Sequence, residues 1–395
     1  MIHYFNPGHE TAVFNASPYY LPSETVLKMQ DDLSFLPAWY AEKGDAVFLP
    51  EIKDPGYFKF LENSFPALPY PSLANNLSER SRDKVSCWGI SPRAIHYFES
   101  LNEKFGLQLQ VPLWKEEYTY LNSRKFARDV LAALQKTING IPDRLIPIFC
   151  DDIDEIEKLL TSSDAPLLAK SLYSSSGRGL LWLSGKLKAK EREVLRGMLR
   201  KQKEVAIEYV LDKQLDFSMQ FSSDGKEISF EGYSLFETTP KGAYTSSYLY
   251  SQEKIEETLA GKIPLEALEN IQQQLILIFK DVIVCHYEGC IGVDMMIYKD
   301  EGEYRIHPCL EINLRYNMGY LGVKMFQHYI SSLSVGVFKI NYNPEKKGAY
   351  DYHLQMCRQF PLSIEKGKIK RGYFPLNPVT KETRYNAFVS VEECG

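Results

Sequence analysis

The alternation of apolar and polar positions along the chain predicts short strands separated by helices. Ile2–Phe5 and Ala46–Leu49 are apolar runs of strand length, while residues 22–40 and 92–105 have helical patterns. Alternating elements of this kind are typical of an α/β domain. We therefore assign residues 1–118 to an N-terminal α/β domain.

Helical and strand patterns continue through the middle of the chain. Ser123 suits the N-cap of a helix with one apolar face, residues 151–160 predict an acidic helix, and Pro264 suits the first turn of a longer helix. From about Gly336 the pattern becomes irregular and more basic. The predicted strands of the middle region are Leu145–Phe149, Pro166–Ser171, Gly179–Leu183, Val205–Val210, Phe217–Phe221, Ser229–Phe236, Ile291–Tyr298 and Tyr304–Leu314.

The last predicted strand carries polar residues at alternate positions, Glu311, Asn313 and Arg315. Side chains at alternate positions of a strand share a face, so two oxygen ligands and a guanidinium are expected to point the same way. The same pattern also describes the solvated face of an ordinary strand. His286 and His307 flank this hairpin, and a lone histidine beside a strand is more often structural than catalytic.

Asp294 lies on the first strand of the same hairpin. If the turn is centred in residues 301–302, Asp294 pairs opposite Cys309 and faces the same side as Glu311. A slip of one residue would reverse its direction. Asp294, Glu311 and the Asn313 amide would then suffice for Mg²⁺, which takes one or two carboxylates, water and phosphate oxygens.

A Ser/Gly-rich loop, residues 172–178, follows a strand that ends near Lys170. Backbone N–H groups and hydroxyls of such a loop can surround phosphate oxygens, and Lys170 would add a point charge. It is not a Walker loop, because no Gly-Lys-Ser/Thr sequence closes it and a strand follows it. Ordinary hairpin turns have the same composition.

A short apolar connector, residues 209–211, separates Glu208 at the end of one strand from Asp216 in the next. The backbone of such a connector can pair with the edge of an adenine ring while Asp216 accepts hydrogen bonds from ribose hydroxyls. Connectors without a ligand look the same.

Composition narrows the class of protein. The chain has 395 residues, 44% hydrophobic and 25% charged, which is enough to bury a large core in two or three lobes. A net charge of -5 gives no basic footprint for nucleic acid, and no apolar run approaches the roughly 20 residues that span a bilayer. The N-terminus lacks a secretory pattern, and the seven cysteines include no Cys-x-x-Cys pair. We expect a cytoplasmic globular protein with reduced thiols and no nucleic-acid or membrane partner.

Taken in order, these features resemble the ATP-grasp superfamily over residues 120–325. The resemblance implies two α+β lobes that hold ATP between them and follow an N-terminal α/β domain. It assigns residues 119–204 to the small lobe with its glycine-rich lid and 205–335 to the large lobe with the metal site. Residues 336–395 then form a C-terminal extension packed on the core.

The resemblance also implies roles for individual residues. Lys170 and Arg315 match catalytic positions, although Asp216 stands where the family usually has a longer Glu. The expected cofactors are ATP and Mg²⁺, with Mn²⁺ as an alternative metal. The expected nucleotide-binding residues are Lys125, Lys170, Ser174, Ser175, Ser176, Gly177, Gly179, Glu208, Leu211 and Asp216, and the expected metal ligands are Asp294, Glu311 and Asn313.

Substrate residues are less defined by the sequence. His9 and Glu10 follow the first strand of an α/β sheet, where ligands often bind, although His9 is equally suited to a helix start or to packing. Tyr244 lies in a long polar and aromatic segment that the family places near the acceptor, and an exposed hairpin would look alike.

Three functions fit these patterns. The leading one is an ATP-dependent ligase that joins a small-molecule carboxylate to an amine through an acyl phosphate. A kinase or other phosphotransferase of the same fold and a non-catalytic nucleotide-binding protein are the alternatives. A homodimer is compatible with each of them.

Overall fold

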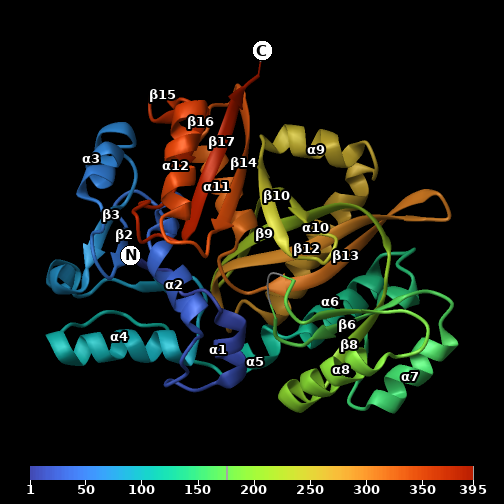
Figure 1. The fold of residues 1–395 in the computed structure, drawn as a ribbon. Helices are drawn as coiled ribbons and strands as arrows, with labels where there is room; N and C mark the ends of the chain where they lie inside the picture. The colour runs from blue at the N-terminus through green and yellow to red at the C-terminus, as the bar shows by residue number, and fades with distance from the viewer. Residues whose placement is uncertain (175–176, 395) are drawn as a thin grey trace. The chain divides into compact units, whose positions relative to one another are not determined.

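The computed structural model describes residues 1–174 and 177–394 (Figure 1), and the chain divides into two compact units. Unit 1 comprises Met1–Lys115, Thr245–Ile255 and Arg315–Gly395, and unit 2 comprises Glu116–Tyr244 and Glu256–Leu314. The sequence predicts four consecutive parts, and this division stays a prediction. The two compact units are arranged differently along the chain, since the C-terminal segment belongs to the same unit as the N-terminal one.

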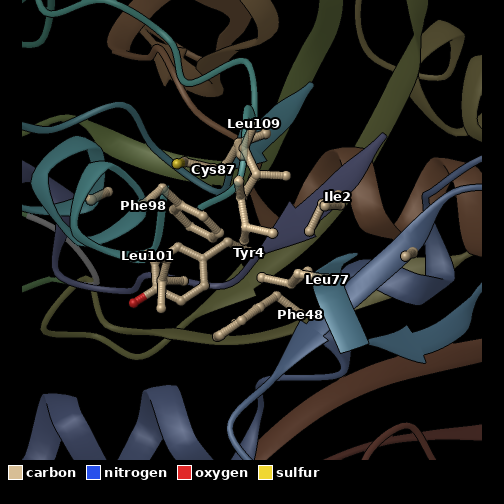
Figure 2. Close-up of a cluster of buried hydrophobic side chains, with 12 residues drawn as sticks. Ile2, Tyr4, Phe48, Leu77, Cys87, Phe98, Leu101 and Leu109 are labelled. Atoms are coloured by element: carbon tan, nitrogen blue, oxygen red, sulfur yellow. The ribbon is translucent and has the colours of Figure 1, made fainter. Parts of the chain in front are cut away.

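A parallel sheet in the order β3-β2-β1-β4 forms the N-terminal part of unit 1. Its strands are β1 (Ile2–Tyr4), β2 (Ala46–Leu49), β3 (Tyr70–Leu73) and β4 (Val85–Cys87). Apolar side chains of β1, β2 and β4 pack with Phe98 and Leu101 of α4 (Pro92–Phe105) in the cluster of Figure 2. Ser91 caps α4 and left-handed Gly106 ends it, so both ends of this predicted helix are confirmed.

The single helix predicted over residues 22–40 was wrong, because two helices occupy this segment. The first, α2 (Glu24–Asp32), ends before the 3₁₀ helix η1 (Leu36–Trp39), which carries Pro37 at its second position. Proline has no N–H and disfavours helical geometry in the residue before it, so an α-helix does not continue here. The other helices of this segment are α1 (His9–Asn15), α3 (Pro55–Ser64) and η2 (Ala74–Arg80).

The C-terminal segment of unit 1 is regular, in contrast to the irregular pattern of its sequence. Its antiparallel sheet runs β11-β14-β17-β16-β15. Trp39 Nε1 donates to the backbone oxygen of Leu376 at 2.8 Å, which joins the two ends of the chain within unit 1. The elements are β11 (Tyr244–Leu249), α11 (Met318–Tyr329), β14 (Ser334–Tyr342), α12 (Gly348–Gln359), β15 (Ser363–Glu365), β16 (Lys368–Pro375) and β17 (Tyr385–Glu393).

The smaller sheet of unit 2 runs β5-β8-β6-β7 and is antiparallel. Ala169 and Ile207 belong to the face that packs on two helices, α7 and α8, whereas Lys170 and Glu208 alternate with them on the other face. The elements are β5 (Ile148–Cys150), α7 (Ile153–Ser162), β6 (Leu167–Ser171), β7 (Leu180–Leu183), α8 (Ala189–Gln202) and β8 (Val205–Tyr209).

The larger sheet of unit 2 runs β13-β12-β9-β10. Phe217 and Phe221 of β9 are buried, and the Phe221 ring lies 5.6 Å from that of Phe279 in α10. Asp216 alternates with them and faces the opposite side. The strands are β9 (Asp212–Asp224), β10 (Ile228–Thr238), β12 (Glu288–Asp300) and β13 (Glu303–Asn313), and the helices are α5 (Glu117–Leu121), α6 (Arg124–Thr137), η3 (Asp143–Leu145), α9 (Gln252–Ala260) and α10 (Leu265–Val282).

The fold class expected from the sequence is confirmed, since a parallel α/β sheet precedes the antiparallel sheets along the chain. Among the described residues, no helix is both long and apolar enough to cross a lipid bilayer.

Candidate functional site

Unit 2 contains a cavity of about 330 Å³ lined by residues of both its sheets. Successive side chains of a strand point to opposite faces of its sheet. The apolar side chains form cores on the faces covered by helices, and the polar side chains between them therefore point to the opposite faces, where the cavity lies. Eight residues that the sequence predicts for nucleotide or metal binding line this unit 2 cavity. They are Lys170, Ser174, Gly177, Glu208, Leu211, Asp216, Asp294 and Glu311.

A buried ion pair lies on the wall that the smaller sheet provides. Lys170 Nζ and Glu208 Oε2 are 2.5 Å apart, and their side chains are only 8% and 11% exposed. Burial raises the pKa of the Glu208 carboxyl, but Lys170 and then Arg124 lower it, and the net pKa is below its usual value. Glu208 is therefore an anion held by Lys170 across neighbouring strands.

His307 lines the same cavity from β13 and is 3% exposed. Its Nδ1 atom is buried and has no hydrogen-bond partner among the described residues. Burial lowers the pKa of His307 to about 4, an effect opposed by Glu208 and reinforced by Lys170. The imidazole is therefore neutral at pH 7.

The Asp216 carboxylate forms an ion pair with one neighbouring side chain and a hydrogen bond with another. Lys213 Nζ lies 2.6 Å from Asp216 Oδ2, and the Thr238 hydroxyl donates to the same oxygen at 2.7 Å. All three residues line the cavity. The ribose contact predicted for Asp216 stays a prediction, and Lys213 is a neighbour that the sequence did not single out.

The hairpin that carries the predicted metal ligands has a different register from the expected one. Near the turn the expected pairing is confirmed, with Asp300 opposite Glu303. Asp294, however, lies opposite Glu311 and not opposite Cys309. The offset is two residues, so Asp294 and Glu311 still share a face.

A bulge in β13 causes this offset. Residues 308–310 of β13 stand opposite Met295 alone, whereas β12 stays in regular pairing with β9 at this point. The bulge begins at Pro308, which cannot donate a ladder hydrogen bond. A pattern of strand residues does not reveal where such a bulge lies, and this is why the predicted partner of Asp294 was wrong.

The three predicted metal ligands lie close together in the structure. Asn313 Nδ2 donates to Asp294 Oδ2 at 3.2 Å, and Asp294 and Glu311 pair across β12 and β13. Among the described residues, no group of three or more His, Cys, Asp or Glu side chains is placed to hold a metal. Two carboxylates nevertheless fit Mg²⁺, because this ion usually takes one or two carboxylates and completes its shell with water and phosphate oxygens.

Arg124, which sequence reasoning overlooked, lies in the cavity wall instead of Lys125. Arg124 Nε donates to the backbone oxygen of Ser171 at 3.0 Å, and Nη2 donates to Glu311 Oε2 at 3.2 Å. Lys125 points elsewhere and forms an ion pair with Glu204. The sequence predicts that Lys125 contacts phosphate or adenine directly. This contact stays a prediction, and the ion pair with Glu204 does not favour it.

The sequence held a signal for Arg124. In α6, Arg124 stands three and seven residues before Ala127 and Leu131, which are buried. An arginine on the apolar face of an amphipathic helix must be paired or hydrogen-bonded, so the position itself marks an unusual arginine.

The Ser/Gly loop is close to a second loop of unit 2. A Cβ atom on Gly177 would lie 2.5 Å from the backbone nitrogen of Ala243, and φ is +73° at Gly177 and +71° at Gly179. Both positions therefore require glycine. The buried Ser174 Oγ has no hydrogen-bond partner within the described ranges. Ser175 and Ser176 lie outside the described residues.

Arg315 was expected on the strand with Asn313, but β13 ends at Asn313 and Arg315 begins the last segment of unit 1. The prediction that Arg315 shares the strand face was therefore wrong. Within unit 1, Arg315 Nε donates to Glu10 Oε1 at 2.5 Å. Burial raises the pKa of Glu10, but Arg315, His9 and a backbone hydrogen bond together lower it, and the net pKa is below its usual value.

His9 and Tyr244, the other substrate candidates, lie in different units. His9 begins α1, is 1% exposed, and has no hydrogen-bond partner at either ring nitrogen among the described residues. A Cβ atom on Gly89 would lie 2.4 Å from the His9 ring, so the ring packs directly on backbone. Tyr244 begins β11, with its ring 6.5 Å from that of Phe236. Their substrate roles stay predictions.

Comparison with known proteins gives a likeness only at the level of structure. No family model matches the chain, and no curated protein matches it either. Among solved structures it is similar to N5-carboxyaminoimidazole synthetase of Staphylococcus aureus complexed with ADP, at 13% identity and a TM-score of 0.50, over 98% of this chain and 92% of that one. It is also similar to the biotin carboxylase complex with beta-gamma-ATP of Campylobacter jejuni, at 9% identity and a TM-score of 0.53, over 100% and 88% of the two chains.

Proposed function

Because the chain has the fold of the ATP-grasp enzymes, we propose that the unit 2 cavity binds MgATP and that the protein is an ATP-dependent ligase. It activates a small-molecule carboxylate as an acyl phosphate, which an amine or a similar nucleophile then attacks. Two similar structures that contain ADP or beta-gamma-ATP support the nucleotide. The substrates are left at the level of chemical class.

The observation that carries this proposal is that a single cavity combines charged and apolar side chains. Its charged lining includes Arg124, Asp294, Glu311 and the Lys170–Glu208 pair. Its apolar lining includes Leu145, Leu168, Met296 and Leu310. A nucleoside triphosphate needs both kinds of contact, because its flat base prefers apolar surroundings and its phosphate chain prefers cations and metal ligands.

A metal ion fits beside the paired carboxylates of β12 and β13. Asp294 and Glu311 would hold Mg²⁺, or Mn²⁺ as an alternative, with the Asn313 amide fixing the orientation of the Asp294 carboxylate. When bound, the ion supplies neutralisation of phosphate charge. Arg124 donates to Glu311 and so orients that carboxylate.

The proposed chemistry has two steps. A carboxylate oxygen of the substrate attacks the γ-phosphorus, the bond to the bridging oxygen breaks, and ADP leaves. The amine then attacks the acyl carbon and loses a proton while phosphate leaves. The protein contributes chiefly positioning and charge neutralisation, for which we propose Lys170, Arg124 and Arg315.

Release of ADP and phosphate, measured against a panel of carboxylates and amines, tests this function. Hydroxylamine added in place of the amine should trap the acyl phosphate as a hydroxamate. A stable phosphorylated product without hydroxamate would identify a kinase instead. ATP binding without turnover on any substrate pair would support the non-catalytic alternative.

Replacing Glu311 by Gln tests the metal site. Loss of the carboxylate should lower Mg-dependent turnover by roughly 100-fold or more while the protein stays folded. Glu303→Gln is the matched control, because Glu303 lies on the same strand with its side chain 78% exposed. Equal turnover in the two variants would show that the metal site is misplaced.

A further inference from the structure

A second cavity, of about 540 Å³, is lined by residues of unit 1 alone, and none of the predicted site residues lines it. Its lining comes from α11 and the segment that follows it, from the β15–β16 hairpin and from the start of α9. We call it the lysine cavity, because Lys366, Lys368 and Lys370 all line it. Its volume is in the range that small organic ligands occupy.

One of these lysines, Lys370, is already neutralised within the chain. Its Nζ atom lies 3.2 Å from Glu365 Oε2 and 3.2 Å from Glu393 Oε1. The two carboxylates raise the pKa of Lys370 above its usual value. The charge of Lys370 therefore requires no external anion.

Lys368 lies two residues earlier on the same strand and has no such partner. Its Nζ donates to the backbone oxygen of Gln327 at 2.6 Å, and it forms no ion pair with any described residue. An ammonium carries three N–H groups, so two remain for other acceptors. Burial lowers the pKa of Lys368, as expected for a partly desolvated cation without a counter-charge. An anion in the cavity would stabilise this ammonium.

Much of the remaining lining is apolar. Val323 and Ile330 are buried, at 4% and 1% exposure, and Phe326 lines the cavity from the same helix as Val323. Leu333 lines it as well, yet its side chain is 66% exposed. The lining therefore offers apolar surface that a ligand can cover.

Two glutamates of the lining limit the charge that a ligand can carry. They are Glu253 at the start of α9 and Glu365, which is paired with Lys370. Both would repel a multiply charged group such as a phosphate dianion. A single carboxylate matches the one partly buried ammonium that lacks a counter-charge, that of Lys368.

We propose that the lysine cavity binds a monocarboxylate with an apolar body. The carboxylate accepts hydrogen bonds from Lys368 Nζ, and the apolar body covers Val323, Ile330 and Leu333. The residues of this site are all different from those of the unit 2 cavity, so the proposed function can fail without affecting it.

Octanoate is a suitable probe, because acetate and 1-octanol each carry half of its chemistry. Titration calorimetry on the full chain should show octanoate binding at least tenfold more tightly than either of them, since acetate lacks the apolar body and octanol lacks the charge. Octanol that binds as tightly as octanoate would overturn the proposal, and so would the absence of octanoate binding.

Substitutions at the two kinds of contact separate their contributions. Lys368→Gln should weaken octanoate binding about tenfold, and Leu333→Ser should weaken it about threefold. Lys339→Gln is the control, because Lys339 is an exposed lysine of β14 that does not line the cavity, and it should bind octanoate like the unaltered protein. Unchanged octanoate affinity in Lys368→Gln would contradict the assignment of the carboxylate to this ammonium.

Octanoate is also a carboxylate of the class that the proposed ligase activates, so its position must be measured directly. In methyl-labelled protein, octanoate should shift the NMR resonances of Val323 and Ile330 but not those of Leu168 and Leu310, which line the unit 2 cavity. Shifts confined to Leu168 and Leu310 would overturn this proposal and leave the proposed function intact. Shifts of Val323 and Ile330 in a protein that binds no ATP would support the lysine cavity and overturn the proposed function.

Discussion

Each unit of the molecule contains a buried glutamate paired with a cation beside a buried histidine, and the two clusters differ in what surrounds them. The ion pairs have the same length, 2.5 Å, and both histidines have a pKa lowered to about 4 by burial. The unit 1 cluster is His9, Glu10 and Arg315, and the unit 2 cluster is Lys170, Glu208 and His307.

The difference lies in free space. His9 packs on Gly89, where even an added methyl group would collide with the ring, whereas His307 faces a cavity of about 330 Å³. Burial and unusual protonation are therefore common to both clusters and do not by themselves identify a ligand site. The cavity beside the His307 ring distinguishes the unit 2 cluster, which we assign to nucleotide binding, from the unit 1 cluster.

The largest expected effect comes from breaking the unit 2 ion pair. Lys170→Met leaves the Glu208 carboxylate buried without its partner, which should cost about 3 to 5 kcal/mol of unfolding free energy. ATP affinity should fall as well, by roughly 100-fold. Denaturant unfolding and calorimetry measure the two effects.

The double variant Lys170→Met with Glu208→Gln separates stability from binding. It removes both charges, so most of the unfolding free energy should return while ATP affinity stays low. Recovery of affinity in the double variant would contradict the role given to Lys170.

The two histidines should make stability depend on pH. The unfolded chain takes up protons near pH 6.5, whereas folded His9 and His307 do so only near pH 4. Stability should thus be complete above pH 6.5 and fall as pH drops toward 4, by roughly 3 kcal/mol for each histidine. The lowered pKa values of Glu10 and Glu208 act in a lower window, where stability is lost as pH falls below about 4.3.

Unfolding free energies measured between pH 7 and pH 4.5 test the histidine window. His9→Gln and His307→Gln should each flatten the curve by a similar amount, since both rings are buried. His286→Gln is the half-exposed control. A slope that neither buried variant changes would show that other groups cause the pH dependence.

A smaller effect is expected from the unit 1 ion pair. Arg315→Lys keeps the positive charge but loses the planar guanidinium that donates to Glu10, so turnover should fall by roughly tenfold. ATP affinity should stay the same, because the nucleotide is assigned to the unit 2 cavity. Steady-state kinetics measures turnover, and calorimetry measures ATP affinity. Weaker ATP binding with unchanged turnover would contradict this prediction.

The smallest effect is expected at Lys125. Its pair with Glu204 involves side chains that are 36% and 31% exposed, and such pairs contribute about 0 to 1 kcal/mol. Lys125→Met should therefore change ATP affinity by no more than roughly threefold, in contrast to the same substitution at Lys170. A loss as large as that of Lys170→Met would restore the phosphate role predicted for Lys125.

Local signals in the sequence were sufficient for much of the fold. β2 and α4 lie at the predicted residues, because each is a continuous run with its own boundary signals. The grouping of residues 315–395 with the N-terminus was not predictable in this way. It depends on contacts such as Trp39 to Leu376, which join residues far apart in the chain.

The site was predictable in its residue types but less so in its geometry. A period-2 pattern placed Asp294 and Glu311 on one face, yet it could not show the bulge that sets their pairing. Helical phase explains the error at Lys125, since neighbouring positions differ by about 100° and Arg124 is the one turned inward. The cavity that His307 lines joins several strands, and no single segment of sequence encodes it.

The bulge at residues 308–310 has a consequence for how this hairpin can change. The bulge lies between the turn and the two carboxylates, so the strand pairing on each side of it has its own register. Insertions at Glu301–Gly302 would therefore lengthen the turn without moving Asp294 relative to Glu311. The turn is therefore a suitable place to attach a fluorophore or an affinity peptide. The same property would let natural homologues vary in length at this turn while keeping the spacing of their two carboxylates.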